Sequence, residues 1–160
     1  MKTRNRPGFS PMLLLAPALL VVTACTTGEG MTRTELRSSL TGLQEVPGPG
    51  DPDGSGTATV RAKPAEGQVC WTLNVRAIET ITVAHIHRGA AGTAGQPVMT
   101  LTTPDASGRS QGCAAVDQAV ARDMAGQAFN YYINVHTAAF PLGAVRGQLR
   151  GEPGRLRQGS

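Results

Sequence analysis

Three histidines are the residues whose types and spacing point most directly to chemistry in this 160-residue chain. They are His85, His87 and His136, and the chain contains no others. A His-x-His pair on a β-strand directs both imidazoles to one face, with Cα atoms about 6 to 7 Å apart, so both rings can reach one ion. A third imidazole from a neighbouring strand would complete a set of three neutral nitrogen donors. Such a set suits copper or zinc and leaves one coordination position open. The sequence therefore predicts a candidate metal site, with copper as the candidate cofactor.

Two arginines are candidates for steering a small anion toward that open position. Arg88 directly follows the His-x-His pair, and Arg146 lies in the last apolar run of the chain. A positively charged side chain beside a metal raises the local concentration of anions. A structural role for the histidines competes with the metal hypothesis: the imidazoles would hydrogen-bond to main-chain carbonyls of the segment 89–95 and hold one end of the domain together. The spacing leaves both hypotheses open.

The elements that must position these side chains are short strands. Alternating apolar runs recur at about ten-residue intervals between Gly, Pro, Asp and Ser clusters, which is typical of a sandwich or barrel. The expected strands are 38–46, 56–63, 68–77, 80–87, 97–102, 109–116, 131–136 and 144–150. One short helix is expected over 117–124, with Asp117 as its N-cap and Gly126 as its stop. The predicted fold class is all-β, an antiparallel Greek-key β-sandwich of about eight short strands with one short helix.

Strand alternation also assigns side chains to faces. In the strand 131–136, Tyr131, Ile133 and Val135 are predicted to face the core, so His136 points away from it. The same rule places Arg146 outward in the last strand. The strand 80–87 is apolar on both faces until its end, which predicts a position inside the sheet rather than at its edge.

Composition and charge exclude several classes of protein. Gly (20) and Pro (11) are abundant and aromatic residues make up only 4%, so a long-helix or coiled-coil protein is excluded. The formal net charge is +4, but removing Lys2, Arg4 and Arg6 of the N-terminal leader leaves 12 basic against 11 acidic residues. The positive charge therefore belongs to targeting, and no nucleic-acid partner is expected.

No catalytic motif is present in the chain. There is no G-x-S-x-G sequence, phosphate-binding loop, dinucleotide fingerprint or C-x-x-C pair. Glu45 and Glu79 are isolated carboxylates, which are interpreted as solubilising residues in turns or at edges. We therefore assign no catalytic residue.

The N-terminus has the features of an export signal. A basic stretch precedes the apolar run MLLLAPALLVV, whose eleven residues are too short to span a bilayer core of about 30 Å. The segment Val22-Thr23-Ala24-Cys25 resembles the bacterial lipobox, which implies a signal peptide over 1–24 and a lipid anchor on Cys25. The alternative is an ordinary signal ending at Ala24 with Cys25 left free. Residues 25–37 are then expected to be a lipidated tether, 38–151 the domain and 152–160 a disordered tail.

The remaining cysteines form an even pair. If Cys25 is lipidated, Cys70 and Cys113 are left in an oxidising compartment, where a disulfide between them is expected. Two separate buried thiols are the alternative.

Four stretches of the chain together resemble the CHRD domain, a module first described in chordin. They are LTGLQEVP (40–47), AHIHRGAAGTAG (84–95), YYINVHT (131–137) and PLGAVRGQL (141–149), in family order, and all three histidines lie within them. The pattern is also distantly similar to the immunoglobulin-like sandwich of copper/zinc superoxide dismutase, where a His-x-His strand and a later histidine bind copper. This chain has no histidines left for a second metal, so a dinuclear dismutase is excluded; a copper-only dismutase remains a weaker hypothesis.

The resemblance implies a lipid-anchored binding or structural module of the bacterial cell envelope, on the extracytoplasmic side, without defined catalysis. Its expected partners are the membrane, through Cys25, and an envelope protein or ligand of unknown identity. The alternative function is copper binding, for storage, delivery or weak redox chemistry, through His85, His87 and His136.

Overall fold

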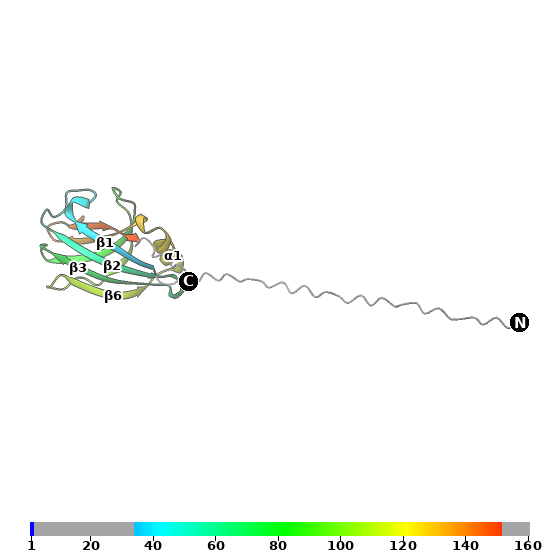
Figure 1. Ribbon diagram of the computed structural model, residues 1–160. Coiled ribbons are helices and arrows are strands. Elements are labelled where there is room, and N and C mark those ends of the chain that lie inside the picture. Colours follow the sequence, from blue (N-terminus) through cyan, green and yellow to red (C-terminus); the bar gives the residue numbers. More distant parts are fainter. Residues whose placement is uncertain (2–33, 152–160) are drawn as a thin grey trace, which may run out of the picture.

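The computed structural model describes Met1 and residues 34–151. Nine antiparallel strands form one continuous, nearly closed sheet in the order β5-β4-β7-β8-β1-β2-β3-β6, with β9 beside β1. Their bounds are β1 Thr34–Thr41, β2 Ser55–Lys63, β3 Gln68–Arg76, β4 Ile81–Arg88, β5 Pro97–Leu101, β6 Arg109–Ala115, β7 Tyr131–Thr137, β8 Val145–Gln148 and β9 Arg150–Gly151. Figure 1 shows β1, β2, β3 and β6 side by side as one layer, with α1 at one end. The predicted all-β, sandwich-like class is confirmed.

The core lies between the two halves of the sheet. Each strand contributes alternate residues, because successive side chains on a pleated strand point to opposite faces. On β2, Ala58, Val60 and Ala62 face inward, and on β7, Tyr131, Ile133 and Val135 do so, as predicted. Burying these apolar side chains is the main driving force that holds the two halves together.

A disulfide links two strands of one half. Cys70 on β3 and Cys113 on β6 are direct cross-strand partners and are bonded to each other. The predicted pairing is confirmed. Val69 and Trp71, on either side of Cys70, belong to the core, so the disulfide lies on the outer face of β3.

The helix α1 (Gln118–Gly126) connects β6 to β7. Asp117 caps it as predicted, because its carboxylate accepts a hydrogen bond from the Ala119 amide at 2.6 Å. Ala121 and Met124 are buried against the sheet. The helix extends to Gly126, two residues past the predicted end, and is followed by the 3-10 turn η3 (Ala128–Asn130).

The first strand differs from the prediction at both ends. It begins at Thr34, so residues 34–37 belong to the sheet and not to the expected tether. It ends at Thr41, because the 3-10 turn η1 (Gly42–Gln44) follows and the chain then folds back. A Cβ on Gly42 would lie 1.9 Å from the Asp51 carbonyl oxygen, so only glycine permits this close approach. The loop 42–54 thereby returns over the outer face of the sheet instead of continuing as strand.

The other strands lie within two residues of their predicted bounds, with one break. The last expected strand, 144–150, is divided at Leu149 into β8 and β9. A further 3-10 turn, η2 (Pro64–Glu66), joins β2 to β3. As expected, β4 lies inside the sheet, between β5 and β7.

The predicted signal peptide, the lipid anchor at Cys25 and the tail 152–160 lie outside the described residues, apart from Met1. Within residues 34–151, no helix combines the length and the apolar character that crossing a bilayer requires.

Candidate metal centre

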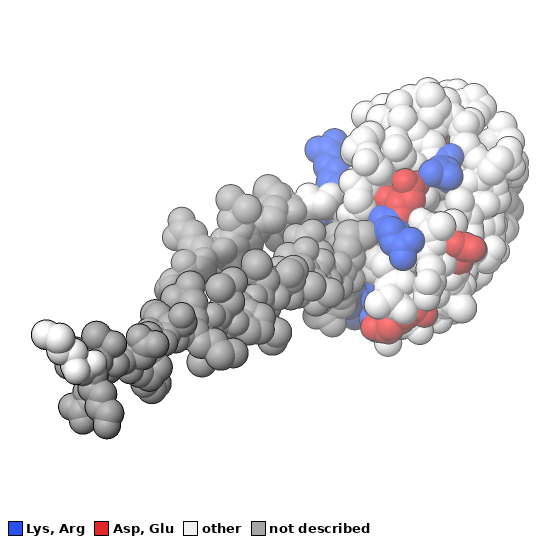
Figure 2. Space-filling model, turned by 90° about the vertical axis from the view of Figure 1, so that its right-hand side faces the viewer, with Lys and Arg blue, Asp and Glu red and all other residues white. Residues whose placement is uncertain are grey.

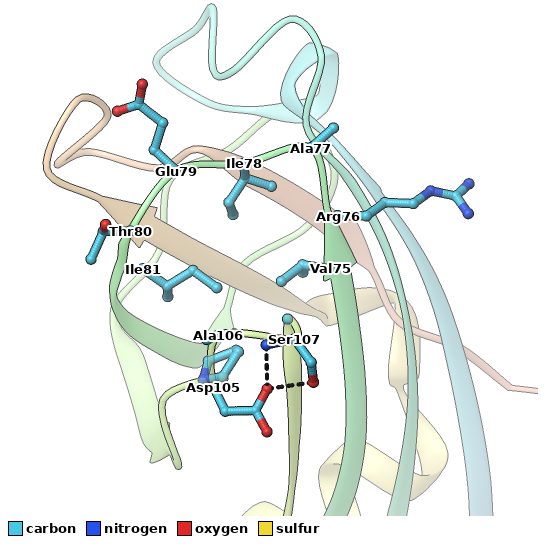
Figure 3. A pocket seen from close by; sticks show the side chains of 12 residues that line it. Val75, Arg76, Ala77, Ile78, Glu79, Thr80, Ile81, Asp105, Ala106 and Ser107 are labelled. Carbon is cyan, nitrogen blue, oxygen red and sulfur yellow. Dashed lines mark hydrogen bonds between the residues drawn. The ribbon is translucent and has the colours of Figure 1, made fainter.

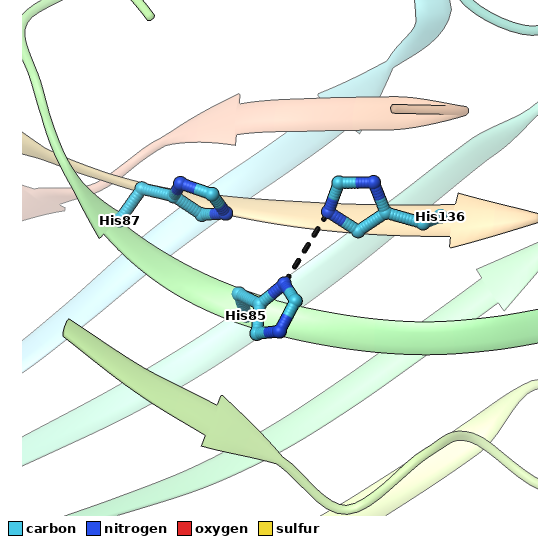
Figure 4. A group of neighbouring side chains, drawn as sticks. All are labelled: His85, His87 and His136. Atoms are coloured by element: carbon cyan, nitrogen blue, oxygen red, sulfur yellow. Dashed lines mark hydrogen bonds between the residues drawn. The ribbon is translucent and has the colours of Figure 1, made fainter. Parts of the chain in front are cut away.

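Pleat alternation on two neighbouring strands brings the three histidines together. On β4, Ala84 and Ile86 are fully buried in the core, so His85 and His87 point to the opposite, outer face. His136 lies on the outer face of β7, the strand hydrogen-bonded to β4. One ligand nitrogen from each of the three rings lies within 4.8 Å of the other two. Figure 4 shows the rings turned toward one another.

Main-chain carbonyls fix the tautomers of two of these rings. His87 Nδ1 lies 2.9 Å from the Gly95 carbonyl oxygen and His136 Nδ1 lies 3.1 Å from that of Pro141. Because a carbonyl oxygen only accepts, each Nδ1 must carry the proton, which leaves a lone pair on each Nε2. Such an outer hydrogen bond is the usual companion of a metal-ligating histidine. One contact of the structural hypothesis is therefore present, from His87 to Gly95, whereas the Pro141 carbonyl lies outside the expected segment 89–95. Both carbonyl contacts use Nδ1 and leave Nε2 of each ring directed toward the other histidines.

The spacing of the nitrogens is close to that of a coordinated set. His85 Nδ1 lies 3.3 Å from His136 Nε2 and donates a hydrogen bond to it, a proton that a bound ion would replace. Two nitrogens bound at about 2.0 Å to one ion with a tetrahedral angle would be about 3.3 Å apart. The nitrogen of His87 is farther away, and His87 Nε2 is buried without a hydrogen-bond partner among the described residues. The longest nitrogen separation would have to shorten from 4.8 Å to about 3.3 Å to complete the set.

The electrostatic surroundings keep all three imidazoles neutral near pH 7. Burial lowers the pKa of each ring below the ordinary value. The neighbouring imidazoles lower the pKa of His85 further. For His87 and His136, the hydrogen bonds to the Gly95 and Pro141 carbonyls oppose the effect of burial but do not cancel it, and at His87 repulsion by His136 and by the Arg146 charge adds to the lowering of the pKa. Neutral rings offer the lone pairs that a metal ion needs.

The two arginines expected to steer anions lie elsewhere. Arg88 points to the other face of β4, where it forms an ion pair with Asp123 of α1 and lies 5.8 Å from the centre of the Tyr131 ring. Its position follows from the pleat, because it is one residue past His87. Arg88 therefore does not belong to the histidine site.

Arg146 is on the same outer face as the histidines, but an aromatic ring separates it from them. Its guanidinium carbon lies 3.4 Å from the centre of the Tyr132 ring, and His87 stacks on that ring at 4.8 Å with 14° between the planes. Because β7 lies between β4 and β8, the two groups contact opposite faces of Tyr132. Arg146 thus supports the ring that holds His87 and does not reach the space between the histidines.

The sequence interpretation missed several residues around this site. Glu45, expected as a solubilising residue, is only 5% exposed, and its carboxylate accepts a 3.3 Å hydrogen bond from the Asn134 side chain. Burial raises the pKa of Glu45 to about 7, against the opposing effects of the Arg146 charge and the Asn134 hydrogen bond. Tyr132 and Asn134 could have been found from the sequence, because both are polar residues at outward positions of the strand 131–136, beside His136. No local signal existed for Glu45, because a folded-back loop buries it.

Another opening lies at the end of the domain where β3 leads to β4. It has a volume of about 550 Å³ and is lined by 75–81 and 104–108 (Figure 3). Its carboxylate Asp105 accepts hydrogen bonds from the Ser107 amide, the Ser107 hydroxyl and the Arg109 amide. These bonds make Asp105 a turn-forming residue, so this opening offers less chemistry than the histidine site.

Surface charge adds no competing site on the face shown in Figure 2. Basic and acidic side chains are interspersed there rather than gathered into one patch of a single sign.

Comparisons with known proteins agree with the motifs that carry the three histidines. The CHRD domain matches residues 36–149, which include β1 through β8 almost entirely. No curated protein and no solved structure matches this chain. Since the match covers most of the sequence, the chain belongs to the CHRD domain family.

Proposed function

We propose that this CHRD domain is a binding module whose ligand is one transition-metal ion, held by His85, His87 and His136. The observation that carries the proposal is the convergence of three imidazole nitrogens within 4.8 Å of one another. Two of these rings already have the tautomer that a ligand requires, fixed by the carbonyls of Gly95 and Pro141.

The donor set selects for copper and zinc. Three imidazoles suit both ions, whereas magnesium and calcium require oxygen ligands. Between the two, Cu(II) binds nitrogen sites more tightly than Zn(II). We therefore expect copper to be the preferred ion, in a storage, delivery or weak redox role. We assign no catalytic step.

Titration of the full chain, purified in detergent and stripped of metal, tests the proposal. Cu(II) is expected to bind one-to-one with a dissociation constant below about 1 μM, and Zn(II) more weakly. The variant with all three histidines changed to alanine is expected to lose the site. Asn74→Ala, on the exposed outer face of β3, is the matched control and should bind as the parent does. Binding weaker than about 10 μM, or binding that the triple substitution leaves unchanged, would contradict the proposal.

We further propose that the module acts outside the cytoplasm, anchored to a bacterial membrane through lipid on Cys25, where it meets envelope partners. The lipobox-like sequence supports the anchor, and the Cys70–Cys113 disulfide supports an oxidising compartment. Cys25→Ser is expected to move the protein from the membrane fraction to the supernatant. An unchanged distribution would refute the anchor, and would leave the metal proposal untouched.

A further inference from the structure

The strand β6 has one edge that no other strand of residues 34–151 pairs with. It is the last strand in the sheet order and is hydrogen-bonded only to β3. Figure 1 shows it at the border of the layer formed by β1, β2, β3 and β6. At its first end, Ser110 Oγ donates to the Thr102 carbonyl, but no strand pairing joins β5 to β6 within the described residues. The side of β6 away from β3, here called the open edge, therefore presents main-chain groups to a further strand.

The pairing with β3 determines which main-chain groups point to the open edge. Val75 N–H donates to the Gly108 carbonyl, and Val116 N–H donates to the Gly67 carbonyl, both at 2.8 Å. These bonds lie at the two ends of the β3–β6 register, and hydrogen-bonded pairs alternate with non-hydrogen-bonded pairs along antiparallel strands. The even-numbered residues of β6 therefore bond to β3, and the odd-numbered residues direct their N–H and C=O groups to the open edge. The odd-numbered residues are Arg109, Gln111, Cys113 and Ala115.

Arg109 differs from the other three because its main-chain groups are already bonded. Its N–H donates to the Asp105 carboxylate, and its carbonyl accepts from the Asp105 N–H. The edge-pointing groups of Gln111, Cys113 and Ala115 have no hydrogen-bond partner in the part of the chain that the structure describes. The open edge thus offers three donors and three acceptors, one of each from every one of these three residues.

These groups are arranged symmetrically about Cys113, so they fit a second copy of the same strand. If two β6 strands run antiparallel about a two-fold axis at Cys113, each Cys113 faces its counterpart and Gln111 faces Ala115 of the other copy. Every unpaired N–H then meets an unpaired C=O. An axis at Gly112 would instead place Ala115 opposite Arg109, whose main-chain groups are not available.

The side chains along the open edge also favour self-pairing. Natural proteins usually protect edge strands with charged residues or proline, and residues 110–116 contain neither. The residues flanking this stretch, Arg109 and Asp117, are exposed and carry opposite charges. With the axis at Cys113, Arg109 of one copy lies opposite Asp117 of the other, so opposite charges meet at both ends of the paired strands.

We propose that this chain forms a symmetric dimer in which two β6 strands pair antiparallel through Gln111, Cys113 and Ala115. The two sheets then continue into one another across the two-fold axis. The disulfide from Cys113 to Cys70 holds β6 against β3 and keeps the open edge in position. Because β3 and β6 lie in the other half of the sheet from β4 and β7, the dimer does not depend on the metal site.

Amide hydrogen exchange of the full chain in detergent, followed by NMR at rising protein concentration, tests the pairing. At low concentration the amides of Gln111, Cys113 and Ala115 should exchange rapidly, whereas those of Gly112 and Ala114, bonded to β3, should be protected. Sedimentation velocity should show a dimer with a dissociation constant on the order of 10 μM. As the dimer forms, exchange at the three edge amides should slow by about fivefold or more.

Three results would overturn the proposal. The first is the absence of a dimer up to about 1 mM. The second is a dimer that leaves the amides of Gln111, Cys113 and Ala115 unprotected, because the contact would then lie on another surface. The third is protection of these amides that does not depend on concentration, because another segment of the same chain would then cover the open edge.

Paired substitutions at two exposed positions test the register. In Gln111→Lys with Ala115→Lys, lysines of the two copies face each other, so the dimer should be about tenfold weaker. Gln111→Glu with Ala115→Lys places opposite charges at the same positions and should dimerise about threefold more tightly than the parent. Ser39→Lys with Asn74→Lys adds the same positive charge to exposed positions of β1 and β3, and should dimerise as the parent does. Equal affinities in the two edge variants would contradict the register.

Discussion

The outer faces of the two halves of the sandwich differ in how far their side chains are exposed to solvent. On β3, the outward residues Thr72, Asn74 and Arg76 are exposed, and the strand alternates between buried and solvated side chains along most of its length. On β7, the outward residues Tyr132 and Asn134 are as buried as the core residues beside them. The loops 42–54 and 89–96 cover this second face, since Glu45 and Gly95 contact Asn134 and Tyr132.

This difference distinguishes a face that contributes to stability, on β3, from a face that carries the proposed site, on β4 and β7. The exposed face of β3 needs no polar network, and a disulfide links it to β6. The covered face buries histidine, asparagine, glutamate and arginine, although burying polar groups costs free energy unless they are paired. Several of these groups remain unpaired within the described residues. Groups of this kind are typical of binding sites, so the comparison favours the β4–β7 face as the location of the proposed metal site.

The largest expected loss of stability comes from breaking the link on the exposed face. Replacing both Cys70 and Cys113 with serine removes a cross-link between residues 43 apart in sequence. We expect the free energy of unfolding to fall by about 4 kcal/mol. Urea unfolding of the double variant against the parent measures the change, with reduced parent protein as the control. A loss under about 1 kcal/mol would mean that the hydrogen-bonded ladder of β3 and β6 holds without the bond.

The inward face of β7 gives the next largest effect. Ile133 is fully buried between two outward polar residues. Ile133→Ala should lower the free energy of unfolding by about 3 to 4 kcal/mol, because it removes apolar contact and leaves a cavity. Thermal unfolding monitored by circular dichroism measures it. If the loss matched that of an exposed substitution, the division of β7 into a core face and a site face would be wrong.

The covered face predicts a dependence of stability on pH. Glu45 has its pKa raised from 4.5 to about 7 in the folded chain. Its protonated form is therefore favoured by folding: the contribution is fully present below pH 4.5 and is lost as the pH rises through 7. The histidine pKa values are lowered, so their contribution has the opposite sign and is lost as the pH falls.

Comparison with Glu45→Gln isolates the glutamate, because the parent and the variant share the histidines. Relative to the parent, the variant should gain stability as the pH rises from 4.5 to 7.5, approaching about 3 kcal/mol. Denaturant unfolding at several pH values measures this gain. If the stability difference between the parent and the variant did not change with pH, Glu45 would be solvated, and its assignment as a buried carboxylate would be wrong.

The smallest effect comes from a matched pair of substitutions. Asn74→Ser on the exposed face should change the free energy of unfolding by less than about 0.5 kcal/mol. Asn134→Ser on the covered face removes the hydrogen bond to Glu45 and should cost about 1 to 2 kcal/mol. Equal effects in urea unfolding would erase the distinction between the two faces.

Local pattern in the sequence predicted most of the fold. Strand periodicity placed β2 to β7 within two residues, and alternation correctly directed His136 outward and Ile133 inward. The failures occur where the chain departs from a strand for reasons that a local pattern does not contain. The strand β1 ends early because Gly42 packs against the Asp51 backbone, a contact between residues of one folded loop.

The candidate site was predicted in part for the same reason. The three histidines are close together because the register of β4 and β7 follows from alternation and pairing. Arg88 was misassigned, since a residue directly after a strand-borne histidine faces the other side. Glu45 could not have been found, because its burial depends on the loop 42–54 folding back over the sheet. This loop has no periodic pattern of apolar residues from which its path could be predicted.

Metal coordination at named nitrogens tests the central claim most directly. Long-range ¹H–¹⁵N NMR of the histidine rings, recorded with and without Zn(II), reports which nitrogen carries a proton and which binds the ion. We predict coordination through His85 Nδ1, His87 Nε2 and His136 Nε2, with the Nδ1 protons of His87 and His136 retained. Ring nitrogens that do not respond to one equivalent of zinc would contradict the account, and the outer face of β4 and β7 would then be a structural network only.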